Sequence, residues 1–88
     1  MRVYLIDRRD QLGYSQRKVA RKSNVSYQYY SQFENGHRGK HISLRMAAKI
    51  ARVLDLTLEE FYVLENKYIE SVELANEKRI YWFWFISY

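Results

Sequence analysis

The chain has 88 residues and a formal net charge of +5, and 48% of its residues are apolar. This size suits one domain around one core, and the absence of cysteine excludes both a disulfide framework and a thiolate zinc site. Charged residues from Asp7 onward interrupt the apolar start, which is unlike a secretory signal peptide, so we expect a cytoplasmic protein.

The positive charge is concentrated in the first part of the chain. Residues 1–54 contain twelve Lys and Arg against three acidic residues, a net charge of +9, whereas residues 55–88 contain three against seven, a net charge of −4. This favours a polyanion as the partner of the first part, because its basic residues do not lie opposite a continuous apolar face as in membrane-surface helices. A solvated basic surface without such a partner is the alternative.

Glycine and small polar residues mark the ends of the predicted helices. Gly13 can adopt the positive φ that closes a first helix. The residues whose hydroxyl can cap a following helix, by accepting a backbone N–H, are Ser15, Ser26, Ser43 and Thr57. We therefore expect helices over residues 16–23, from 27 to a stop at Gly36, over 44–54, and from 58 onward.

Apolar residues recur three and four positions apart in these stretches, as in helices with one buried face. The expected inward residues are Leu5, Val19, Ala20, Tyr30, Phe33, Leu44, Ala47, Ile50, Ala51, Leu54, Leu58, Phe61 and Leu64. Asn24 tolerates left-handed backbone and suits the short turn before the third helix. The sequence thus predicts a mainly α protein with a five-helix domain over residues 1–64.

The pattern changes after Glu65. Residues 67–74 alternate loosely between polar and apolar, and residues 79–88 are almost wholly aromatic or β-branched, which is typical of strands. We therefore interpret residues 65–88 as a C-terminal aromatic extension that forms a β-strand, or a β-hairpin with its turn at 75–78. A helix continuing over residues 66–78 is the alternative.

Two short capped helices joined by a short turn are typical of a helix-turn-helix, here from Gln16 to Asn35, in which the small Ala20 lets the two backbones approach closely. The second helix of such a pair enters the DNA major groove while the first lies across the backbone. Gln28 and Gln32 lie four positions apart on the outer face, and a glutamine can bond adenine N6 and N7 together. The sequence therefore predicts a DNA-reading surface on this helix.

Several short segments, weak singly, are specific together: Ser15-Gln16, Val19-Ala20, Val25-Ser26, Phe33-Glu34-Asn35-Gly36 and Leu56-Thr57-Leu58-Glu59-Glu60-Phe61. With them, residues 5–61 resemble the phage repressor and Cro group of helix-turn-helix regulators, also called the XRE family. The resemblance implies a five-helix repressor-like domain that binds double-stranded DNA as a dimer on a pseudo-palindromic operator. Three residues depart from the family pattern: Ser23 replaces a residue that is usually apolar, Tyr30 one that is usually aliphatic, and Asn24 the common turn glycine.

The resemblance also implies roles for single residues. It assigns contacts with base edges to Tyr27, Gln28, Ser31 and Gln32. It assigns contacts with phosphates to Gln16, Arg17, Asn35, Arg38, Lys40 and His41, with Gln16 also bracing Gln28. Arg9 and Glu34 would form a structural ion pair that orients the reading helix without touching a base.

The aromatic segment of the extension needs a covering surface, because an exposed segment of this composition would aggregate. We interpret it as a dimerisation element that pairs with a second subunit through Tyr81, Trp82, Phe83, Trp84 and Phe85. Packing against the core of its own chain is the alternative. The segment is too short to cross a bilayer, which takes about 20 apolar residues in a helix.

These features favour a transcriptional regulator, specifically a repressor, that acts at the nucleoid. The alternative is a protein-binding module, such as an antitoxin or an anti-regulator, that binds another protein through the aromatic tail. No catalytic or cofactor-binding motif is present, and the pair His37 and His41 lacks further metal ligands nearby. We therefore expect no enzymatic activity, no cofactor and no bound metal.

Overall fold

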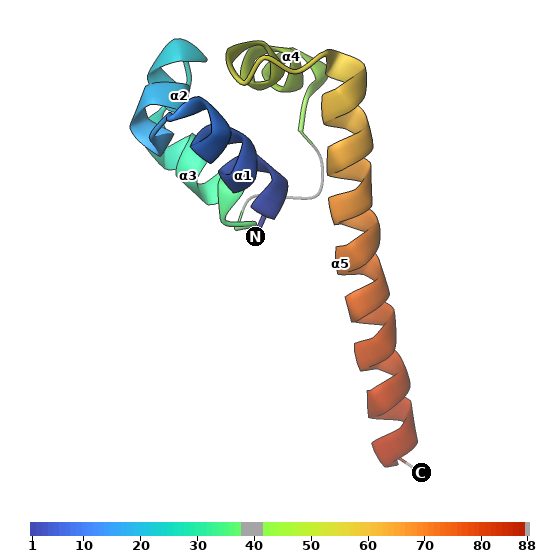
Figure 1. Cartoon of the computed structure of the whole chain (residues 1–88). Coiled ribbons are helices and arrows are strands. Elements are labelled where there is room, and N and C mark those ends of the chain that lie inside the picture. The colour runs from blue at the N-terminus through green and yellow to red at the C-terminus, as the bar shows by residue number, and fades with distance from the viewer. Residues whose placement is uncertain (38–41, 88) are drawn as a thin grey trace.

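The structure is a computed structural model that describes residues 1–37 and 42–87, with the side chains of residues 76–87 excepted. The described residues form five helices and no strand (Figure 1). The helices are α1 (Val3–Leu12), α2 (Gln16–Lys22), α3 (Tyr27–Glu34), α4 (Leu44–Val53) and α5 (Leu58–Ser87). The predicted five-helix domain is confirmed.

Hydroxyl side chains cap the helix starts as the sequence predicts. The Oγ atoms of Ser15, Ser26 and Ser43 each accept a backbone N–H three residues further on, at 3.1, 3.0 and 3.1 Å. Thr57 forms a reciprocal capping box with Glu60: its Oγ1 accepts the Glu60 N–H at 3.0 Å, and its own N–H donates to Glu60 Oε1 at 3.3 Å. These bonds satisfy amides that a helix start leaves without an intrahelical partner.

Among the described residues, four adopt the left-handed backbone where one helix gives way to the next. Gly13 (φ 69°), Asn24 (φ 55°) and Gly36 (φ 80°) lie at ends or turns that the sequence marks. Asp55 (φ 56°) does the same between α4 and α5, and the sequence reasoning missed it. Asparagine and aspartate tolerate this region better than other residues with a Cβ, which explains why neither of these two turns needs a glycine.

The helices enclose one apolar core. Its members, all less than a tenth exposed, are Leu5, Val19, Ala20, Tyr30, Phe33, Ala47, Ile50, Ala51, Leu54 and Phe61. All of these were predicted to face inward, whereas Leu44 and Leu58 remain 72% and 40% exposed. The core thus lies among the first four helices and the first turns of α5.

The prediction of a strand in the C-terminal extension is wrong. The β-strand or β-hairpin expected within residues 65–88 is not formed; α5 instead continues through Ser87, beyond the helix considered as the alternative for residues 66–78. An added strand would leave its backbone groups without a partner strand in this helical fold, whereas extending a helix gains one hydrogen bond for each residue added. The aromatic composition therefore did not decide the backbone conformation.

Figure 1 shows α5 leaving the other four helices along its second half, and the molecule measures 52 × 25 × 24 Å. The division expected between residues 64 and 65 lies within this continuous helix. A search of the described residues for a helix long and apolar enough to cross a membrane found none.

Candidate nucleic-acid interface

The helix pair α2 and α3 is packed closely. Val19 and Ala20 on α2 are buried, with exposed fractions of 0% and 2%, and the Ala20 carbonyl accepts the N–H of Val25 at 3.0 Å. Because Ala20 has only a methyl side chain, α3 can approach the α2 backbone at this point. The turn between the helices passes through the left-handed Asn24. This geometry is that of a helix-turn-helix.

The outer face of α3 carries the four residues predicted to contact bases. Tyr27 and Gln28 are exposed, and Ser31 and Gln32 are half-buried. The opposite face of the helix holds Tyr30 and Phe33, which are buried in the core. The structure therefore brings the four predicted residues together on one accessible surface.

Cations on α2 lie over aromatic rings. The Arg17 guanidinium lies 4.2 Å from the centre of the Tyr27 ring, and this contact joins α2 to the first turn of α3. Away from α3, the ammonium groups of Lys18 and Lys22 lie 4.6 and 5.0 Å from the centre of the ring of Tyr14, which precedes α2. Such contacts hold cationic side chains at the surface without neutralising them, so α2 retains a positive potential.

A buried carboxylate connects α3 with the two helices before it. The Arg9 guanidinium donates to both carboxylate oxygens of Glu34, at 2.8 and 2.7 Å, and Gln16 Nε2 donates to one of them at 2.9 Å. The Glu34 side chain is only 1% exposed. Burial acts to raise the pKa of Glu34, but the hydrogen bonds from Arg9 and Gln16 outweigh it and hold this pKa below the ordinary value.

Gln16 thus has a partner other than the one expected for it. Its amide donates to Glu34, whereas the sequence assigns it a phosphate contact and a brace to Gln28. The bond to Glu34 fixes the amide at the N-terminus of α2, beside the C-terminal end of α3. Both expected contacts remain predictions about the DNA-bound protein.

The other residues predicted to contact phosphate follow α3. Asn35 ends the helix, is exposed, and donates its backbone N–H to the Ser31 carbonyl at 3.0 Å. Arg38, Lys40 and His41 lie outside the described residues. The structure therefore places Asn35 at the edge of the reading face.

Two of the departures from the family pattern bury a hydroxyl. Within the described part of the chain, Ser23 Oγ and Tyr30 Oη are the buried side-chain atoms without a hydrogen bond. Burial, together with the nearby Glu34 carboxylate, raises the pKa of Tyr30, so the phenol stays neutral.

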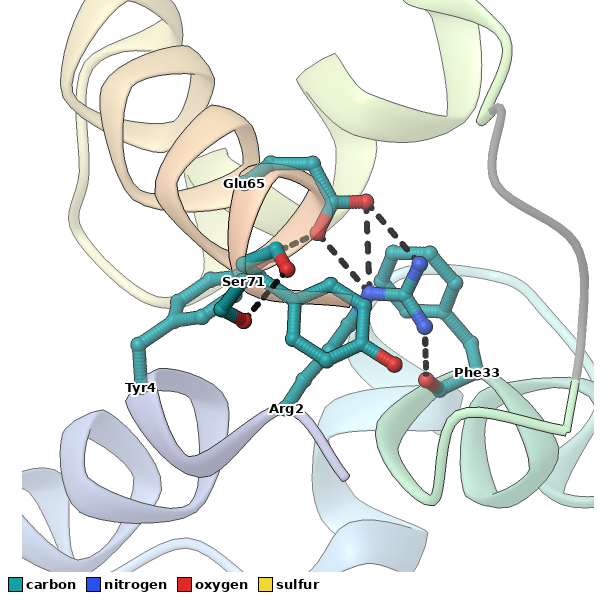
Figure 2. Close-up of polar contacts among 6 residues, drawn as sticks. Arg2, Tyr4, Phe33, Glu65 and Ser71 are labelled. Atoms are coloured by element: carbon teal, nitrogen blue, oxygen red, sulfur yellow. Dashed lines mark hydrogen bonds and ion pairs between the residues drawn. The ribbon is translucent and has the colours of Figure 1, made fainter. Parts of the chain in front are cut away.

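A second buried ion pair was missed by sequence reasoning (Figure 2). Arg2 is 1% exposed and donates through Nε to Glu65 Oε1 at 2.8 Å and through Nη1 to the Phe33 carbonyl at 2.6 Å. Tyr4 Oη also donates to Glu65, at 2.9 Å. The partners are 63 positions apart, and no local pattern relates them. From the sequence alone, an arginine before the first helix and a glutamate on the fifth would both be expected at the surface.

Comparison with models of known protein families identifies the family of this chain. The family model described as Helix-turn-helix matches residues 5–61, about two thirds of the chain. The chain belongs to this helix-turn-helix family. The match covers the segment for which the sequence resembled the XRE family, so that resemblance is confirmed and the protein is an XRE-type, DNA-binding helix-turn-helix regulator. Neither the curated proteins nor the solved structures gave a significant match.

Proposed function

We propose that this helix-turn-helix protein is a sequence-specific transcriptional repressor that reads the major groove with α3. The observation that carries the proposal is the outer face of α3, where Gln28 is exposed between Tyr27 and Ser31 while the opposite face is buried. An exposed glutamine on a groove-facing helix can bond adenine through two hydrogen bonds. Tyr27, Ser31 and Gln32 supply the remaining contacts with base edges.

Phosphate contacts surround this face in the proposal. Gln16 and Arg17 at the start of α2 bind one phosphate group, and Asn35 binds another at the end of α3. Arg38, Lys40 and His41 complete the set by analogy with the family. The net charge of +9 over residues 1–54 supports this arrangement, because most of the affinity for DNA arises from neutralised phosphates.

The active species in the proposal is a homodimer at the nucleoid. The extension, residues 65–88, would associate through Tyr81, Trp82, Phe83, Trp84 and Phe85, and each subunit would place one α3 in successive major grooves about 34 Å apart. Exposed apolar side chains on the described part of α4 and α5 add surface for association: Leu44, Leu58 and Tyr62 are 72%, 40% and 66% exposed. Such a dimer would recognise a pseudo-palindromic operator.

Selection of bound duplexes from a random pool, at a stated salt concentration, tests the proposal. We expect two related half-sites whose centres are separated by about one or two helical turns. A pool that remains random after selection would contradict sequence-specific reading. A single unpaired half-site would contradict the dimer.

The extension lies outside the matched residues 5–61, and this favours a second candidate, a protein-binding module such as an antitoxin. Deleting residues 80–88 separates the two functions. A monomer that binds a half-site weakly supports the repressor dimer. A dimer that retains tight operator binding but loses a protein partner supports the second candidate.

A further inference from the structure

Arg2 bonds two elements that no sequence pattern relates. Its guanidinium contacts the Glu65 carboxylate on α5 through Nε and Nη2, at 2.8 and 3.1 Å. The same group donates through Nη1 to the Phe33 carbonyl at 2.6 Å. The backbone N–H of Arg2 donates to the Glu34 carbonyl at 2.7 Å. Arg2 thus donates hydrogen bonds to the last two carbonyls of α3 and to a carboxylate on α5. Figure 2 shows the contacts of its side chain.

The surroundings fix the Arg2 guanidinium in this position. It lies 3.9 Å from the centre of the Phe33 ring and 4.4 Å from that of the Tyr68 ring. Tyr4 Oη donates to Glu65 Oε1 at 2.9 Å and so holds the carboxylate from α1. A cation at the C-terminal end of α3 also meets the negative end of the helix dipole. A buried guanidinium held in this way cannot move unless α3 or α5 moves with it.

The position of this cluster relative to the family domain suggests its purpose. Arg2, Tyr4, Glu65 and Tyr68 all lie outside the matched residues 5–61, and the carbonyls of Phe33 and Glu34 lie inside. The cluster therefore joins the part of α5 that exceeds the family domain to the end of the helix that reads DNA. Glu34 is also the residue whose carboxylate holds Arg9 and Gln16, so the cluster acts on a helix end that is already anchored.

We propose that Arg2 is a positioning residue for DNA reading, and that the Arg2–Glu65 pair couples the placement of α5 to the orientation of α3. Arg2 does not touch DNA in this arrangement. A second subunit that binds α5 changes the affinity of α3 for its operator, and operator binding changes the stability of α5, because coupling between two sites is reciprocal. The inference rests on the proposed function, in which α5 carries the contacts of the dimer.

The test replaces both Arg2 and Glu65 and compares this double variant with a control in which another arginine is replaced. In the double variant Arg2→Met/Glu65→Leu, apolar residues of similar size fill the buried site and leave no unpaired charge, and unfolding in urea checks that the variant folds. The control is Arg8→Met, because Arg8, on α1, also donates to carbonyls at a helix end, those of Leu54 and Asp55, at 2.8 and 3.1 Å. That end belongs to α4, so the control removes an arginine anchor without altering α3.

Affinities are measured for the selected operator and for a random duplex of equal length, together with unfolding in urea. The double variant should bind the operator about tenfold more weakly and the random duplex as the wild type does. Arg8→Met should retain the wild-type ratio of the two affinities. The single variant Arg2→Lys, which keeps the positive charge, should lose less operator affinity than the double variant does. A folded double variant with the wild-type ratio would overturn the coupling and leave Arg2 a structural role alone.

Hydrogen exchange on the wild-type protein supplies a second measurement that needs no variant. Operator binding should slow exchange at the amides of residues 65–69 on α5, which lie across the Arg2 contacts from the end of α3. Unchanged exchange there, with slowed exchange on α3, would overturn the proposal. If selection returns no preferred sequence, the proposed repressor function fails, but exchange with any duplex that binds still tests the coupling.

Discussion

The guanidinium of Arg9 holds the carboxylate of Glu34 in a two-point ion pair, with N–O distances of 2.8 and 2.7 Å. The pair was expected from the family resemblance, and it joins α1 to the last residue of α3. Because Gln16 donates to the same carboxylate, one buried charge aligns both helices of the helix-turn-helix. Its protonation state therefore bears directly on the geometry of the DNA-reading unit.

Stability should fall at acidic pH through Glu34. Its pKa lies below the ordinary value of 4.5 in the folded chain, so the stabilisation is fully present above that value and is lost as the pH falls through the folded pKa. We expect the urea midpoint to decrease below about pH 4.5. Glu34→Gln should lower stability by about 3 kcal/mol at neutral pH, because it leaves the half-buried Arg9 guanidinium without an opposite charge, and should flatten the acid limb. An equally steep acid limb in that variant would assign the pH dependence to another carboxylate.

Gln28 and Arg17 should contribute to DNA binding in different ways. Gln28→Ala removes a proposed base contact and should cost about 1–3 kcal/mol on the selected operator, with little effect on random duplexes. Arg17→Ala removes a phosphate contact and should weaken binding to all duplexes, with a salt slope lower by about one. Titrations at several salt concentrations distinguish the two. Equal losses on operator and random DNA for Gln28→Ala would contradict base reading.

The two left-handed glycines at helix ends should respond differently to alanine. At Gly13 a Cβ would meet nothing within 4 Å, so Gly13→Ala should cost only about 1 kcal/mol for the positive φ. At Gly36 the Cβ would lie 2.8 Å from Tyr68 Oη and 3.1 Å from the Met1 nitrogen, so Gly36→Ala must also displace the Tyr68 side chain and shift the N-terminus slightly. We expect Gly36→Ala to be the more destabilising by at least about 1 kcal/mol in urea unfolding. Equal costs would show that Tyr68 moves aside freely.

Serine-to-alanine changes at the two ends of α2 should have opposite signs. Ser15→Ala removes the cap of the Lys18 amide and should lower stability by about 1 kcal/mol. Ser23→Ala removes a buried hydroxyl that has no hydrogen bond within the described residues, and should raise stability by up to about 1 kcal/mol. Thermal unfolding of the two variants under one condition gives the comparison. A destabilised Ser23→Ala would mean that a water or a neighbouring group satisfies the hydroxyl.

Local patterns predicted the helices because the deciding interactions are local. Each cap joins residues three positions apart, as Ser15 and Ser26 do, and the left-handed Asn24 depends on its own side chain. The inward residues follow from spacing along one helix, so the buried positions of Tyr30 and Phe33 were predictable. The face that the reading helix leaves exposed followed from the same spacing.

The features that sequence reasoning missed depend on distant residues. The strand was predicted from the aromatic composition of the extension. In the structure, the helix that Thr57 caps continues through these residues to Ser87. Arg2 and Glu65 meet only because the fold brings the chain before α1 against the second turn of α5. Their burial reverses the ordinary expectation that charged residues face water.

An uninterrupted α5 fixes both the distance between its two ends and the rotation of the far end about the helix axis. α5 runs from Leu58 to Ser87, a length of about 45 Å at 1.5 Å per residue, so whatever binds its far end is set at a definite rotation from the DNA-reading face. One alanine inserted between Glu73 and Leu74 would turn that end by about 100°, whereas four would return it to within about 40° of its starting direction. Operator affinity should then rise and fall with the number of inserted residues, with the period of the helix itself.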